Sequence, residues 1–469
     1  MKPLQILFLC FCSLFSRAQK NDSLFLSFSE FLKNVKEYHP VSRQSALLLP
    51  LAEAGVMSAR GQFDPKLWYT QEQKQYDNKN YWNIQNGSLK IPTLPGLEFT
   101  AGYDRNIGSN TNPEHATSTN GLAYTQISMP LLQGLLIDER RFALKNAKLF
   151  RDLSLLEQKN MLNELFSKAS KSYWEWAQSY YNLQVIREGV QLADQRLQGI
   201  KQAALLGDNA HIDTLEASIQ YQDRLVTMQQ QEMDFYSKTL LLSVFLWTDK
   251  NEALELSSPL IPPSTEDLDN TDLSASILPV IDSLTASHPV ILSYQNKKSR
   301  LALEFKLKQD KLKPVLNAKF NPLYNPSNLQ SSVLYGNNSY KWGLSFQVPL
   351  LLRKERGELK IAKLKLKDVQ YETDYKKAEI TNKLKASLNE YTNTKNQLAQ
   401  FNTIVQNYNK LLQAEKKLFD LGESSVFMVN SREMSYLNSR LKLNDLMFKY
   451  RKAAVDMLYH SGQLYSLPQ

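Results

Sequence analysis

Two carboxylates stand three residues apart, at Asp213 and Glu216, shortly after Gly207. Side chains with this spacing share one face of a helix. The pair could present negative charge toward a cation or a basic partner, or it could belong to a solvated helix face. The spacing alone leaves both interpretations open.

The other reactive residue types are sparse. The five histidines, at positions 39, 115, 211, 288 and 460, lack the His-x-x-x-His spacing of helical metal ligands. Both cysteines, Cys10 and Cys12, lie in a segment that we expect to be removed, so the mature chain has no thiolate. No phosphate-binding glycine loop and no nucleophile–base motif stands out. We therefore expect no catalytic, metal-binding or cofactor-binding site, and we predict that the protein is not an enzyme.

Residues 1–18 have the pattern of a secretory signal peptide. Lys2 precedes the apolar run 4–15, and small residues follow at Ser16 and Ala18. A run of this length is too short to span a bilayer, which takes about 20 residues. No later stretch approaches 18 apolar residues. We expect an exported chain without a lipid anchor, because bulky Leu9 and Phe11 precede the two cysteines, and export makes nucleic acid an implausible partner.

Prolines divide the rest of the sequence. Residues 131–258 and 350–467 contain none, and proline is excluded from helix interiors. Each stretch has one break, at Leu206-Gly207 and at Leu421-Gly422, where glycine can adopt the left-handed conformation that ends a helix. The sequence therefore predicts two helical hairpins, 137–247 and 353–464. Their first arms, 137–206 and 353–421, would each be about 100 Å long.

Segments ahead of the helices have the period of β-strands. In residues 340–348, aromatic and aliphatic side chains alternate with polar ones, as in a half-buried strand or a barrel strand with lipid on one side. Strands are expected within 66–129 and 314–348, one hairpin from each region. Pro130 and Pro349 would form the strand–helix joints. An additional hairpin near 84–105 would either join the sheet or form an outer loop.

Four landmarks occur twice in the same order. They are His-Pro at 39 and 288, a proline at 65 and 314, Pro-Leu-Leu at 130 and 349, and Leu-Gly at 206 and 421. We interpret residues 19–248 and 277–469 as two copies of one unit. An acidic, proline-containing linker, 249–276, joins them. The fold class is then α+β and internally duplicated, with long helical hairpins of coiled-coil type.

This doubled order of elements, behind a secretion signal, resembles the TolC-type outer-membrane efflux family over nearly the whole mature chain. The resemblance implies a homotrimer in which the strands form one shared transmembrane β-barrel. The helices would form an α-barrel in a large periplasmic portion. The glycine turns would be the periplasmic tip, which docks a periplasmic adaptor (membrane fusion) protein and an inner-membrane pump, through the residues Leu206, Gly207, Leu421 and Gly422.

The resemblance also implies a passive exit duct of a tripartite efflux or type I secretion system, for small molecules, metal ions or proteins. Relatives carry acidic residues six and nine positions after the second tip glycine, where this chain has Met428 and Ser431. Asp213 and Glu216 have that spacing in the first copy, and a ring of them would favour cations. The alternative is a periplasmic coiled-coil adaptor or scaffold without a pore, although adaptors usually have a single hairpin.

Basic residues flank the expected strands, before Pro314 and after Pro349. They would meet the headgroups of outer-membrane lipid or form a solvated helix face, and they comprise Lys306, Lys308, Lys311, Lys313, Arg353, Lys354, Arg356, Lys360 and Lys363.

Overall fold

The computed structural model describes residues 25–207, 210–254, 260–263, 281–324 and 339–466. The chain divides into two compact units. The tip unit comprises residues 1–34, 172–271 and 405–445, and the sheet unit comprises residues 35–171, 272–404 and 446–469. The expected signal peptide and most of the expected linker lie outside the described residues.

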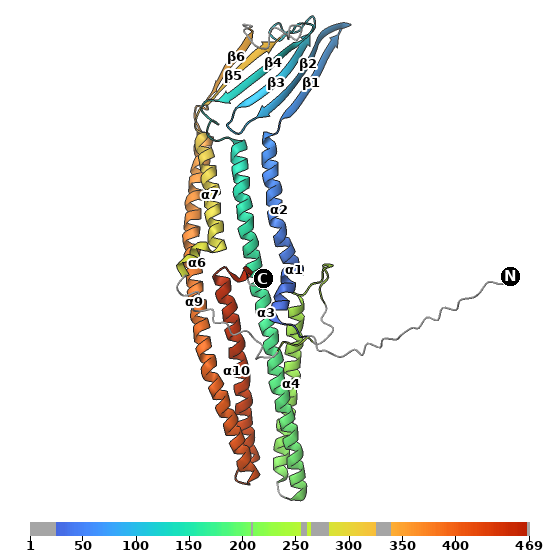
Figure 1. The fold of residues 1–469 in the computed structure, drawn as a ribbon, viewed down its shortest axis with the longest axis vertical. Coiled ribbons are helices and arrows are strands. Elements are labelled where there is room, and N and C mark those ends of the chain that lie inside the picture. Colours follow the sequence, from blue (N-terminus) through green and yellow to red (C-terminus); the bar gives the residue numbers. More distant parts are fainter. Residues whose placement is uncertain (1–24, 208–209, 255–259, 264–280, 325–338, 467–469) are drawn as a thin grey trace, which may run out of the picture. The chain divides into compact units, whose positions relative to one another are not determined.

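Long helices dominate both units (Figure 1). The helices are α1 (Phe28–Tyr38), α2 (Pro40–Arg60), α3 (Glu139–Leu206), α4 (His211–Ser243), α6 (Ile281–Ser287), α7 (Pro289–Asp310), α9 (Arg353–Asp420) and α10 (Val426–His460). Helices α3 and α9 each contain 68 residues, which corresponds to about 100 Å. The shorter arms end before the expected residues 247 and 464. Beyond α4 the chain turns into a β-bridge between Trp247 and Ala253, and beyond α10 it turns at Gly462, whose φ is +72°.

Two histidines start helices α2 and α7 with nearly identical geometry. His39 has φ −64° and ψ 132°, and His288 has φ −61° and ψ 130°. In each, Nδ1 accepts a hydrogen bond of 3.2 Å from the backbone N–H two residues later. Proline follows at the first helical position, where a missing N–H costs nothing. Both His-Pro pairs are therefore helix starts.

The strands form one antiparallel sheet in the order β1-β2-β3-β4-β5-β6. They are β1 (Lys66–Tyr76), β2 (Lys79–Pro92), β3 (Glu98–Ile107), β4 (Leu122–Pro130), β5 (Val315–Tyr324) and β6 (Tyr340–Gln347). The expectation of one hairpin from each region is wrong, because the first region supplies four strands. Its additional segment near 84–105 forms most of β2 and β3, which pair with β1 and β4 within the sheet.

The sheet has one apolar and one polar face. Directly paired residues point to the same face of a sheet. An unbroken apolar row crosses β2 to β6 through Ile91, Phe99, Ile127, Phe320 and Trp342. All five side chains are exposed. Neighbouring positions on these strands are polar: Lys90, Thr100, Gln126, Asn321 and Lys341.

Aromatic and aliphatic seams hold the helices together within each unit. In the sheet unit, Tyr391 of α9 stacks on Tyr450 of α10, and their hydroxyl oxygens lie 2.7 Å apart. In the tip unit, Tyr173 and Trp174 of α3 pack against Phe28 of α1. Tyr173 and Trp174 therefore serve helix packing. Among the described helices, none is both long and apolar enough to cross a membrane.

Candidate functional site

The turn between α9 and α10 depends on a left-handed glycine. Gly422 has φ +78°, a conformation that costs other residues roughly 1–2 kcal/mol. Its N–H donates to the carbonyl of Phe419 at 2.9 Å, and the N–H of Glu423 donates to the carbonyl of Leu418 at 2.9 Å. This pair of bonds is the Schellman motif, which satisfies the last carbonyls of a helix.

The turn between α3 and α4 uses the same device. Gly207 has φ +85°, and its N–H donates to the carbonyl of Ala204 at 3.2 Å. No atom outside its immediate neighbours lies within 4 Å of a Cβ built on either glycine. Backbone conformation, and not lack of space, is therefore what requires glycine here. Both turns lie at the same end of the tip unit (Figure 1).

Apolar side chains project into solvent at both turns. Leu206 is 78% exposed and Leu421 is 72% exposed. Behind them a small core joins the helices and holds the turns in place. It contains Leu197, Ile200, Ala217 and Val426.

The two carboxylates lie on the first two turns of α4. Asp213 and Glu216 are half-buried, and Glu216 accepts a hydrogen bond of 3.1 Å from Gln220. On α10, Met428 is half-buried and Ser431 is exposed. The tip unit therefore carries charge at these positions only in its first hairpin. Within the described residues, no group of three potential metal ligands comes together.

A buried cluster of charge holds three helices of the tip unit together. The side chain of Glu433 on α10 is 0% exposed, and it pairs with Arg196 of α3 and Arg224 of α4. Arg224 also donates to the carbonyl of Gly189 at 2.7 Å, and both guanidinium groups donate to Oδ1 of Asn430. Burial lowers the pKa of Arg196, an effect that Glu433 opposes and Arg224 reinforces.

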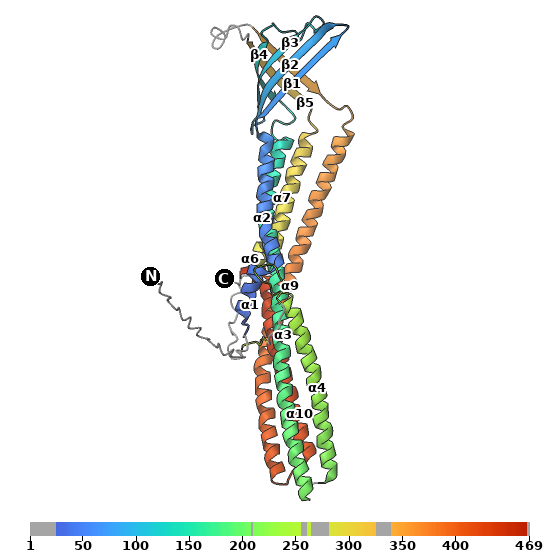
Figure 2. The ribbon, with the colours of Figure 1, turned by 90° about the vertical axis from the view of Figure 1, so that its right-hand side faces the viewer.

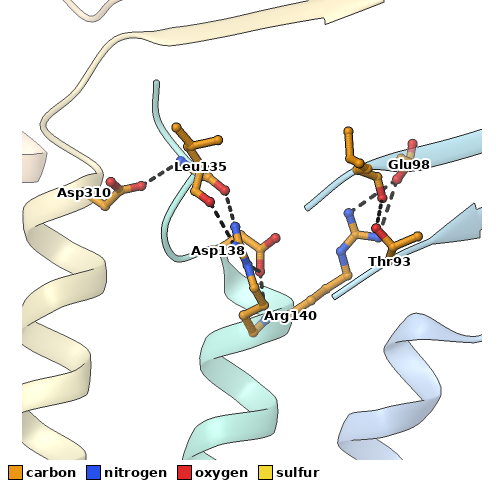
Figure 3. Close-up of polar contacts among 9 residues, drawn as sticks. Thr93, Glu98, Leu135, Asp138, Arg140 and Asp310 are labelled. Atoms are coloured by element: carbon orange, nitrogen blue, oxygen red, sulfur yellow. Dashed lines mark hydrogen bonds and ion pairs between the residues drawn. The ribbon is translucent and has the colours of Figure 1, made fainter. Parts of the chain in front are cut away.

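The first strand–helix joint combines a glycine turn with a buried carboxylate (Figure 3). Pro130 is the last residue of β4, and the N–H of Leu131 still donates to the carbonyl of Leu316 in β5, at 2.7 Å. The chain then turns at Gly134, whose φ is +83°. The N–H of Gly134 donates at 2.6 Å to Oδ2 of Asp310, the last residue of α7. The end of α7 thus supports the start of α3.

Two arginines complete this joint from the first turn of α3. The backbone N–H of Arg141 donates to Asp138 at 2.7 Å, and its guanidinium donates to the carbonyls of Gly134 and Leu135. Arg140 reaches Glu98 on β3, with an ion-pair distance of 3.3 Å. At the second joint, Pro349 lies two residues beyond β6 and four residues before α9.

Sequence reasoning missed the Glu433 cluster and the Asp310–Gly134 contact. Glu433 and Arg224 are 209 residues apart, and Gly134 and Asp310 are 176 residues apart. The available signal for Glu433 was its place between two apolar residues, Val429 and Leu437, each four positions away on the same helix face. Nothing in the sequence near Asp310 pointed to Gly134.

Comparisons with known proteins identify the class of fold. No sequence-family model matches the chain, and no curated protein matches it. Solved structures of outer-membrane channels, in contrast, do match the chain. The CmeC channel of Campylobacter jejuni is 13% identical, with a TM-score of 0.65 over 92% of this chain and 85% of that channel.

Two further channels show a similar likeness. The outer membrane protein VceC of Vibrio cholerae is 13% identical, with a TM-score of 0.64 over 92% of this chain and 95% of VceC. The open state of the MtrE outer membrane channel of Neisseria gonorrhoeae is 11% identical, with a TM-score of 0.64 over 94% of this chain and 90% of MtrE. The chain therefore has the fold of TolC-type outer-membrane channels, as its resemblance to that family predicted.

Proposed function

We propose that this protein is the outer-membrane exit duct of a tripartite efflux or type I secretion system, with a large periplasmic helical portion. The likeness in fold to outer-membrane channels, over more than nine-tenths of the chain, is the observation that carries the proposal. The duct would be passive, because the chain offers no catalytic motif, and its inner-membrane partner would supply the energy.

The sheet supports a membrane location for this part of the chain. Its apolar row from Ile91 to Trp342 suits contact with lipid, and its polar face suits contact with water. Strands β1 and β6 are the two edges of the sheet, and open edges are not tolerated in hydrocarbon. We propose that three copies join these edges into one shared barrel.

Helix α4 supports association of several copies. Apolar residues recur on it every seven positions, which is the spacing of a coiled-coil seam. Each is 51–72% exposed in the single chain, and together they form the α4 stripe: Ile212, Ile219, Val226, Met233 and Leu240. A helix of a neighbouring copy would cover this stripe.

The turns at Gly207 and Gly422 would be the periplasmic tip that docks the adaptor protein. Exposed Leu206 and Leu421 would supply apolar contacts there. Asp213 and Glu216 would form a carboxylate ring in the trimer and favour cations at the entrance. The exported substrate would be a small molecule, a metal ion or a protein.

Reconstitution of the purified protein in planar bilayers tests this proposal. A trimer, detected by native mass spectrometry, should give discrete single-channel conductance steps. Asp213→Asn/Glu216→Gln should lower its preference for cations over anions. A protein that stays monomeric and inserts no channel would contradict the proposal and support the alternative, a periplasmic adaptor or scaffold without a pore.

A further inference from the structure

Positive charge is concentrated where the helices of the sheet unit meet the sheet. Residues 139–151 begin α3, residues 297–313 contain the end of α7, and residues 353–367 begin α9. These segments contain 19 basic and five acidic residues. Their net charge of +14 exceeds the +9 of the whole chain, so the remainder is net negative.

These three segments form a belt beside the sheet, which we call the basic belt. At most eight residues separate each helix end from its strand, β4, β5 or β6. The corresponding ends of α3, α7 and α9 adjoin the sheet (Figures 1 and 2). The charge therefore lies next to the part of the chain with the exposed apolar face.

Some cations of the basic belt form ion pairs between helices. Lys311 pairs with Glu139 at 2.5 Å, and Lys308 pairs with Glu358 at 2.8 Å. Ten other cations are exposed and form no ion pair within the described part of the chain. They are Lys145, Lys148, Lys298, Lys306, Arg353, Lys354, Arg356, Lys360, Lys363 and Lys367.

Eight of these ten cations gather in two places. Five follow one another on α9 at alternating intervals of three and four residues, from Arg353 to Lys367, and so share one face of that helix. The other three, Lys145, Lys148 and Lys306, line a groove of about 460 Å³ between α3 and α7. Leu149, Ala302 and Leu303 give this groove an apolar floor. Cations around an apolar floor suit an anionic amphiphile.

We propose that the basic belt binds the phosphate headgroups of anionic phospholipids in the leaflet next to the helices. This inference rests on the proposed function, which places the sheet in a membrane. The apolar face would contact the acyl chains, and the cations just beyond the strands would meet the headgroups. Fixed positive charge at such a surface attracts anionic lipid, and the attraction falls off within a Debye length, about 8–10 Å.

Distance from the sheet divides the cations of α9 into two groups. At 1.5 Å per residue, Arg353, Arg356 and Lys360 lie within about 11 Å of the helix start. Lys363 and Lys367 lie about 15 and 21 Å along the helix, beyond the reach of a screened headgroup charge. The near group binds lipid, and the far group does not.

A matched pair of variants tests this division. The near variant is Arg353→Gln/Arg356→Gln/Lys360→Gln. The far variant, Lys363→Gln/Lys367→Gln/Lys377→Gln, removes the same charge from the same helix. Each protein is reconstituted in vesicles containing brominated phosphatidylglycerol or brominated phosphatidylcholine. Quenching of tryptophan fluorescence then gives the relative affinity for the two lipids. Exposed Trp342, which belongs to the apolar row, is a suitable reporter.

We expect the wild type and the far variant to prefer phosphatidylglycerol, with a preference that falls as salt is added. Each neutralised near cation should lower the preference about fivefold. Inorganic phosphate at about 10 mM, a typical buffer concentration, should not abolish the preference for phosphatidylglycerol. If it does, the basic belt binds free phosphate, and the lipid proposal is overturned.

Three other outcomes would overturn the inference. The wild type could show no preference between the lipids, or both variants could lose it equally. The near variant could instead change the ion selectivity of the channel and leave lipid binding intact, which would place these cations in the lumen. A protein that inserts and conducts without lipid preference contradicts this inference alone, whereas a protein that does not insert contradicts the proposed function.

Discussion

Single side chains decide how several helices of this protein begin and are held together. His288 caps α7 through Nδ1, which accepts a hydrogen bond only when the ring is neutral and carries its proton on Nε2. Burial lowers the pKa of His288 to about 4, nearby His460 acts in the same direction, and a hydrogen bond to the carbonyl of Tyr459 opposes both. The cap is therefore coupled to pH.

Replacement of His288 by asparagine should make stability less dependent on pH. The folded-state pKa of about 4 lies below the ordinary value of 6.5, so the unfolded chain binds the proton more tightly. Stability from this residue is complete above about pH 6.5 and is lost as the pH falls toward 4. Asparagine retains an N-cap acceptor but does not titrate. Between pH 7.5 and 5, the melting temperature should fall less in His288→Asn than in the wild type; equal falls would contradict this account.

Glu433→Gln should strongly destabilise the tip unit. The change leaves Arg196 and Arg224 buried without their carboxylate, and loss of one partner from a buried ion pair costs about 3–5 kcal/mol. The matched control is Glu232→Gln, because the ion pair of Glu232 with Arg187 is largely exposed and such pairs contribute at most about 1 kcal/mol. Guanidinium denaturation followed by circular dichroism would measure both. Similar losses in the two variants would show that the buried cluster has no special role.

At the scale of elements, turns and joints set the length of each helix. The Schellman motif at Gly422 ends α9, and the left-handed Gly207 ends α3. At the other end of α3, Gly134 turns the chain and Asp310 satisfies its N–H. Each device works because it pairs backbone groups that a helix or strand terminus leaves open.

Gly199 within α3 and Gly207 directly after it should respond to alanine in opposite directions. Gly207→Ala forces a side chain into the left-handed region and should cost about 1–2 kcal/mol. Gly199 lies inside the helix with no atom within 4 Å of an added Cβ, so Gly199→Ala should stabilise by up to about 1 kcal/mol. Thermal unfolding of the two variants would measure the difference. The turn would not need its glycine if both changes proved stabilising.

At the scale of the whole molecule, the single chain leaves apolar surface uncovered on the sheet and along α4. Internal duplication stays a prediction, which the matched starts of α2 and α7 and the equal lengths of α3 and α9 support. The two copies differ in the sheet, to which the first contributes four strands and the second two.

Charge within the α4 stripe should prevent assembly. Ile219→Glu/Val226→Glu would bury two carboxylates in the proposed contact between copies, at a cost of several kcal/mol. Thr227→Glu/Gln231→Glu adds the same charge on the partly exposed side of α4 that points away from the stripe. Native mass spectrometry in detergent should find monomers for the first variant and trimers for the second. Trimers of the first variant would show that α4 does not mediate assembly.

The sequence by itself determined the long helices, their turns and the histidine caps. These features depend on local chemistry: proline is absent from 131–258 and 350–467, glycine at 207 and 422 permits a positive φ, and His-Pro begins a helix. Alternation identified strands near 340–348, since strand period is also a property of neighbouring residues.

Only the tertiary structure decided how many strands share the sheet, which residues form the joint at Gly134, and which residues form ion pairs with Glu433. The contact between Gly134 and Asp310 joins residues 176 positions apart in the chain, and the ion pair between Arg224 and Glu433 joins residues 209 positions apart. Hydrogen bonds and ion pairs act over about 3 Å and do not depend on distance along the chain. Local patterns can therefore predict the elements, but only their packing brings such partners together.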